Sequence, residues 1–158
     1  MKTNLFRSLL VLGVVLAAAL LPFQANAAQC STASTAGNWA YTYTGTIFTA
    51  SGPLPLASVG HFHQDLWGNI TGSQARSVAG QSGLEDISGT NAVSGDCTAS
   101  LTINVFVNGQ LLRTAQLAAV YDSSGNHVRA IFQSLTLPDG TNVPVVITID
   151  GNRVTWRQ

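Results

Sequence analysis

The chain has 158 residues, of which 46% are hydrophobic and only 9% are charged, and its formal net charge is zero. This length suits one domain with a sizeable core, and the hydrophobic content excludes an intrinsically disordered chain. No basic patch is present to attract nucleic acid or anionic lipid, and no motif indicates a cofactor.

The N-terminus has the features of a secretory signal peptide. Lys2 and Arg7 precede residues 9–21, an almost unbroken apolar run that is too short to span a membrane. An Ala-Asn-Ala cleavage site follows, so we expect residues 1–27 to be removed and residues 28–158 to form a single domain. Loss of Lys2 and Arg7 would leave the mature chain two charges negative. We therefore predict a secreted or periplasmic protein without an integral membrane segment.

From Trp39 almost to the C-terminus, short segments with an apolar residue at every second position alternate with turn signals. Such alternation is typical of strands with one buried face, and Asn108-Gly109 favours a tight hairpin. The predicted strands cover residues 37–50, 56–67, 70–78, 84–93, 97–107, 110–121, 128–137, 142–149 and 153–156. A series of eight or nine sequential strands predicts an all-β fold, an antiparallel up-and-down β-barrel of about eight strands without exposed edges. A two-sheet β-sandwich is the alternative.

Three segments of this series need interpretation. Pro53 and Pro55 predict that residues 51–55 form a loop, because proline cannot donate to a strand ladder. Asp-Gly-Asn at residues 150–152 predicts a turn between the last two strands. Residues 110–121 also fit a helical stripe, but the hairpin turn before them favours a strand.

Two cysteines, Cys30 and Cys97, remain after the predicted cleavage. In an exported chain an even number of cysteines favours a disulfide, which would tie the mature N-terminus to a strand in the middle of the chain. A reactive or metal-binding thiol is less favoured, because export is oxidising and no Cys-x-x-Cys is present. A lipid anchor on Cys30 is also less favoured, because Gln29 stands where lipoprotein processing prefers a small residue.

Two resemblances to known barrels are carried by turn and strand residues. Gly37-Asn38-Trp39 resembles the opening strand of lipocalin- and avidin-like (calycin) barrels. A wider pattern is similar to exported bacterial proteins of unknown function, which are related in architecture to allene oxide cyclase-like barrels. It comprises Gly45, Gly52-Pro53, residues 57–60, Asp65, Gly68-Asn69, residues 88–90 and residues 96–98. This second resemblance implies the barrel fold, secretion and the Cys30–Cys97 pair, and it assigns no catalytic residue.

An aromatic stripe on the first predicted strand is a candidate ligand wall. Trp39, Tyr41 and Tyr43 lie at every second position and therefore share one face of the strand. They would either line a ligand site, as aromatic rings often do, or simply fill the core of the barrel.

His61 and His63 share one face of a predicted strand with Asp65, and the two histidines are the candidate metal ligands. Two imidazoles two residues apart can reach one Zn²⁺, Cu²⁺ or Fe²⁺ ion, with a third ligand from elsewhere in the chain. The alternative, which alternation favours, is a solvent-facing strand surface on which these residues bind nothing.

The remaining charged candidates are few. Glu85 and Asp86 are adjacent, so they should point to opposite faces of a strand, and we expect them to mark a solvated strand end rather than a catalytic pair. Arg113 and Arg129 lie on neighbouring predicted strands and would either meet a carboxylate ligand inside a barrel or pair with surface aspartates.

Three functions fit this sequence, and whether the protein is an enzyme stays open. The first is an exported protein that binds a small apolar ligand in the barrel mouth. The second, implied by the resemblance, is an allene oxide cyclase-like cyclase or isomerase. The third is a structural or surface-associated extracellular module. A hollow apolar lumen with Arg or His at its base would favour the first two, and a lumen filled by side chains would favour the third.

Overall fold

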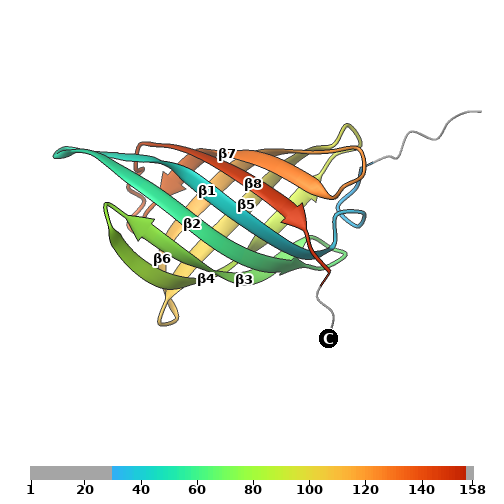
Figure 1. Ribbon diagram of the computed structural model, residues 1–158, viewed down its shortest axis with the longest axis horizontal. Coiled ribbons are helices and arrows are strands. Elements are labelled where there is room, and N and C mark those ends of the chain that lie inside the picture. Colours follow the sequence, from blue (N-terminus) through green and yellow to red (C-terminus); the bar gives the residue numbers. More distant parts are fainter. Residues whose placement is uncertain (1–29, 156–158) are drawn as a thin grey trace, which may run out of the picture.

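The computed structural model describes residues 30–155, so the predicted signal peptide lies outside the described residues. Eight antiparallel strands form a closed barrel in which each strand pairs with its neighbours in the chain and the first pairs with the last (Figure 1). The strands are β1 (Gly37–Thr49), β2 (Gly52–Gln64), β3 (Asn69–Val78), β4 (Gln81–Val93), β5 (Thr98–Val107), β6 (Gln110–Tyr121), β7 (His127–Thr136) and β8 (Val145–Arg153). The predicted up-and-down barrel is confirmed, and the sandwich alternative is wrong.

The two ends of this barrel differ. The β1–β2, β3–β4 and β5–β6 turns lie at one end, which we call the hairpin end, and the β1–β2 hairpin reaches furthest there (Figure 1). Residues 30–36 lie at the other end, which we call the capped end. Among residues 30–155, no helix is long and apolar enough to cross a membrane.

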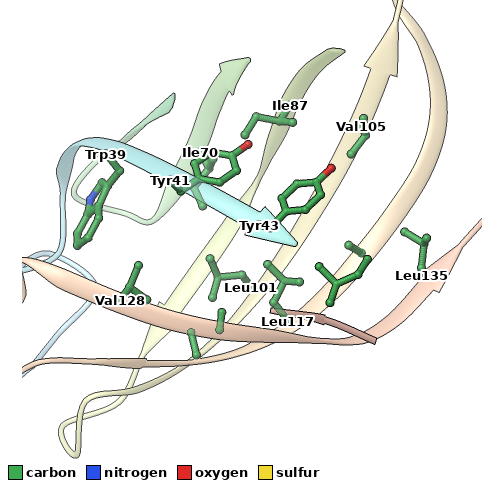
Figure 2. Packing of buried hydrophobic residues seen from close by; sticks show 14 of the residues in the cluster. Trp39, Tyr41, Tyr43, Ile70, Ile87, Leu101, Val105, Leu117, Val128 and Leu135 are labelled. Atoms are coloured by element: carbon green, nitrogen blue, oxygen red, sulfur yellow. The ribbon is translucent and has the colours of Figure 1, made fainter. Parts of the chain in front are cut away.

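Alternation along the strands separates a lumen from an outer surface. On β1, for example, Trp39, Tyr41 and Tyr43 are buried while Thr42 and Thr44 are exposed. Each of the eight strands contributes at least one buried apolar residue to the same central cluster. In Figure 2 the three β1 aromatic side chains follow one another along this cluster, starting from Trp39. The core of the protein is therefore the barrel lumen, and any cavity must lie among these side chains.

The loop predicted for residues 51–55 is wrong. Gly52 begins β2, and Pro53 and Pro55 pair with β1 opposite Phe48 and Thr46. On its other side β2 pairs with β3 only from Leu56 onward. The missing N–H groups of the two prolines are tolerated because this part of β2 belongs to the protruding hairpin, where one side has no strand partner.

The turn predicted at residues 150–152 is also wrong, because β8 continues to Arg153. Gly151 pairs with Tyr41 on one side and Val128 on the other. It is buried, and a Cβ atom there would lie 2.9 Å from Val128 Cγ1 and 3.4 Å from Tyr41 Cβ. Glycine is therefore needed here for the close approach of neighbouring side chains rather than for a turn.

The predicted disulfide is confirmed. Cys30 and Cys97 are bonded with their Cα atoms 4.9 Å apart, which ties the segment before β1 to the residue before β5. The backbone amide of Val93 also donates to Thr32 Oγ1 (3.0 Å). Residues 30–36 are thus attached to the barrel at two points, at the end of β4 and just before β5.

Buried polar side chains complete this closure. Gln64 Nε2 donates to Thr35 Oγ1 (2.9 Å), and Asn91 Nδ2 donates to Gln64 Oε1 (2.8 Å) and to the Tyr121 hydroxyl (2.8 Å). Trp39 Nε1 donates to the Thr35 carbonyl oxygen (3.0 Å). All five residues are buried, so the layer closes the lumen at this end.

Substitution of Gly151 tests the close approach in the wall of the barrel. Gly151→Ala should lower the free energy of unfolding by about 1–3 kcal/mol, because the added methyl group overlaps Val128. Gly83→Ala on β4 is the matched control, since nothing lies within 4 Å of a Cβ atom there. It should leave stability unchanged or raise it by up to about 1 kcal/mol. Urea denaturation measures both, and equal losses in the two variants would contradict the packing described.

Candidate functional site

A cavity of about 70 Å³ lies inside the barrel, and residues from all eight strands line it. Since about 10–15 Å³ of such space holds one water molecule, the cavity has room for several waters or for one small organic molecule. Most of its lining is aliphatic or aromatic, including Ile87, Leu101, Leu117 and Phe132. The lumen is therefore hollow and largely apolar.

A group of polar side chains interrupts this apolar wall. Gln74 and Arg76 on β3 and Arg113 on β6 line the cavity, and Tyr41 and Tyr43 line it from β1. Arg76 lies close to the β3–β4 turn and Arg113 close to the β5–β6 turn, so the two arginines lie toward the hairpin end. The polar wall and the cap are thus at opposite ends of the lumen.

The Glu85 carboxylate on β4 is the centre of this polar group. Arg113 binds it with both terminal nitrogens: Nη1 donates to Oε1 (3.0 Å) and Nη2 donates to Oε2. Arg76 Nε donates to Oε1 (2.9 Å), and Gln74 Nε2 donates to Oε2 (2.6 Å). The side chains of Glu85 and Arg113 are only 5% and 8% exposed. One buried carboxylate is thus shared by two guanidinium groups.

Gln74 connects the ionic group to the tyrosines of β1. Its Oε1 accepts a hydrogen bond from the Tyr41 hydroxyl (2.7 Å), and its Nε2 also donates to the Tyr43 hydroxyl (3.2 Å). Burial is the main cause that raises the pKa of both tyrosines, to well above the ordinary range for Tyr41. Both hydroxyls are therefore protonated at neutral pH and can act as hydrogen-bond donors.

The pKa of Glu85 is lowered by its partners. Burial alone would raise it, but the hydrogen bonds and positive charge of Arg113, with smaller contributions from Gln74 and Arg76, outweigh the burial. A carboxylate held below its ordinary pKa is ionised at neutral pH. Glu85 is therefore a fixed negative charge that fully engages its partners, rather than a group poised to exchange a proton.

The structure separates the aromatic residues predicted as a ligand wall. Tyr41 and Tyr43 line the cavity. Trp39 instead belongs to the capped end, where it stacks on Phe62 and Arg153 lies over its ring at 5.5 Å. Contact of Tyr41 and Tyr43 with a ligand stays a prediction, and their position in the cavity wall supports it.

The predicted metal ligands lie on the outer surface. His61 and His63 are exposed, and His63 Nδ1 lies 3.0 Å from Asn38 Oδ1. Asp65 accepts hydrogen bonds from the backbone amides of Trp67 and Asn69, which gives it a role in the β2–β3 turn. Within residues 30–155, no three His, Cys, Asp or Glu residues are grouped so that they could hold a metal ion. Metal binding at His61 and His63 stays a prediction for elemental analysis.

The structure places some of the charged residues on other faces of the barrel than the sequence predicts. The solvated strand end predicted for Glu85 is wrong, because Glu85 shares the inward face of β4 with Ile87. Arg113 lies inside the barrel, whereas Arg129 is 78% exposed and lies 3.8 Å from the Asp150 carboxylate.

Gln74 and Arg76 line the cavity but were not predicted from the sequence, although both share the inward face of β3 with the buried Ile70. Their even spacing from Ile70 was the sequence signal that could have placed them inside the barrel.

Comparison with protein families and with curated proteins finds no match. Among solved structures, the chain is similar to a redesigned β-barrel, mFAP1, bound to DFHBI, at 20% identity with a TM-score of 0.49, over 77% of this chain and 97% of the other. An S-type phycobiliprotein lyase, CPES, from Guillardia theta gives 9% identity and a TM-score of 0.44, over 87% and 100% of the two chains. A putative AttH from Nitrosomonas europaea gives 9% and 0.35, over 77% and 53%. Likenesses of this strength carry no argument about function.

The Glu85 cluster predicts a specific dependence of stability on pH. Because the folded-state pKa of Glu85 lies below its ordinary value of 4.5, its stabilisation is fully present above that pH and is lost as the pH falls through the folded-state pKa. Glu85→Gln should lower the free energy of unfolding at pH 7 by about 3–5 kcal/mol, since it leaves two guanidinium groups without their carboxylate.

Urea denaturation from pH 7 to pH 2 checks this prediction. The native protein should lose more stability over that range than Glu85→Gln, and turn aspartates with lowered pKa values contribute equally to both proteins. Asp86→Asn is the matched control, because the neighbouring Asp86 is exposed on the outer face. Parallel pH curves for the native protein and Glu85→Gln would argue against the buried cluster.

Proposed function

We propose that this protein binds a small, largely apolar molecule in the lumen of its barrel. The observation that carries the proposal is the cavity of about 70 Å³, which combines an aliphatic and aromatic wall with a few convergent polar groups. Hollow sites of this composition are the usual form of small-molecule sites in proteins. A purely structural module would gain more stability from a lumen filled by side chains, because cavities destabilise a core.

The arrangement of the two ends supports the same function. The buried layer of Thr35, Gln64 and Asn91 closes the capped end, so a ligand would reach the cavity from the hairpin end. The Cys30–Cys97 disulfide fixes this closure and is typical of proteins that fold in an oxidising compartment, outside the cytoplasm. We therefore propose an exported binding protein with one access route.

Binding is favoured over a cyclase or isomerase activity by the state of the polar group. A general acid or base works best with a pKa near the working pH. The pKa of Glu85 is instead moved downward and those of Tyr41 and Tyr43 upward, away from neutrality in both cases. These groups are suited to hold and orient a ligand, with no proton transfer required of them.

Toluene, as a small apolar probe, tests whether the lumen is a binding site. In methyl-labelled protein it should shift the NMR signals of cavity residues such as Ile87, Leu101 and Leu117. Ala119→Val adds bulk to the cavity wall and should weaken toluene binding several-fold. Ala118→Val, on the outer face of the same strand, is the matched control and should leave it unchanged.

The natural ligand would be sought by mass spectrometry of organic extracts of the purified protein. The proposal fails if toluene shifts no lumen methyl signal in the native protein, or if the two valine variants weaken its binding equally.

A further inference from the structure

The ionisable groups that face the cavity do not balance in charge. Among the described residues, the charged side chains in its wall are Arg76 and Arg113, and Glu85, which both of them bind, is not part of that wall. One carboxylate for two guanidinium groups leaves a single positive charge in excess. Burial makes such an excess unfavourable unless water or an anion compensates it.

The hydrogen bonds show which arginine carries the excess. Arg113 uses Nη1 and Nη2 on Glu85, whereas Arg76 uses only Nε. Within residues 30–155, the two Nη groups of Arg76 have no hydrogen-bond acceptor, and neither group is fully buried. The Arg76 side chain is 22% exposed. Arg76 lines the cavity, and its place near the β3–β4 turn puts it toward the hairpin end.

We propose that the lumen ligand carries a single carboxylate, which the free Nη edge of Arg76 binds while the apolar part of the ligand fills the cavity. This inference rests on the proposed function and specifies the class of ligand. A guanidinium edge presents two parallel N–H donors that match the two oxygens of a carboxylate. A monoanion neutralises one excess charge, whereas a phosphate monoester carries nearly two charges at neutral pH.

The position of the anchor fits a ligand that inserts with its apolar end first. Arg76 is near the end of β3, at the hairpin end, and the aliphatic wall continues from there toward the cap. A carboxylate held by Arg76 would stay near the mouth, so its remaining hydration would not have to be removed completely. The apolar tail would contact Ile87, Leu101 and Leu117 deeper in the lumen.

The test compares three probes of equal chain length: hexanoate, hexan-1-ol and hexylamine, each titrated into the full disulfide-bonded protein at pH 7 and followed by methyl NMR. Hexanoate should bind at least about tenfold more tightly than hexan-1-ol, as expected for charge-assisted hydrogen bonds. Hexylamine should bind more weakly than both. Arg76→Gln should remove the preference for hexanoate while hexan-1-ol still binds. Arg129→Gln, on the outer face, should change nothing.

A second measurement needs no variant, in case Arg76→Gln does not fold. The Nε–Hε signal of Arg76 in the native protein should shift on addition of hexanoate and stay in place with hexan-1-ol. Equal affinity for the acid and the alcohol, an unchanged preference in folded Arg76→Gln, or an unmoved Arg76 signal would each overturn the carboxylate inference while leaving the proposed function intact. If none of the three probes binds, the carboxylate inference fails, and the proposed function fails with it when toluene does not bind either.

Discussion

The buried Glu85 carboxylate is the group on which the organisation of the lumen depends. Through it and Gln74, side chains from β1, β3, β4 and β6 are joined by hydrogen bonds around the cavity. These strands include non-neighbours, so the cluster ties together parts of the barrel that backbone pairing alone does not connect. A one-residue slip of β4 would turn Glu85 to the solvent and leave Arg113 buried without its partner. The cluster therefore favours one register over its alternatives.

The two ends of the lumen use polar groups in different ways. At the capped end, Thr35, Gln64 and Asn91 are joined by hydrogen bonds and close the barrel. At the hairpin end, Arg76 keeps donors that no side chain of the described chain accepts. A polar layer with its main donors satisfied contributes rigidity, whereas unused donors beside an apolar cavity are suited to a ligand. This asymmetry is the physical basis for assigning one end to closure and the other to recognition.

Much of the barrel could be predicted because local signals determine it. The alternation in β5 and the Asn108-Gly109 turn indicate a hairpin without knowledge of the remaining chain. The two errors arose where a neighbour decides the conformation. Gly151 looks like a turn residue, but Val128 and Tyr41 on adjacent strands require it to be small. Pro53 and Pro55 look like loop residues, but the protruding hairpin tolerates them.

The polar wall was harder to predict for the same reason. Tyr41 and Tyr43 were found from their own strand, since β1 alternates clearly. Glu85 was assigned to a solvated strand end because it and the adjacent Asp86 point to opposite faces of the strand and so do not form a catalytic pair. What makes Glu85 acceptable there is Arg113, 28 residues away, together with Arg76 and Gln74. Such a partnership depends on the closed topology and cannot be inferred from spacing along one strand.

A double-mutant cycle between Glu85 and Arg113 tests most directly whether this ionic group occupies the lumen. The free energy of unfolding would be measured for the native protein, Glu85→Gln, Arg113→Gln and the double variant. A buried, doubly hydrogen-bonded pair predicts a coupling energy of about 2–3 kcal/mol, with the double variant less destabilised than the sum of the two single variants. A coupling energy near zero would contradict the account, because it would mean that the two side chains do not meet inside the barrel.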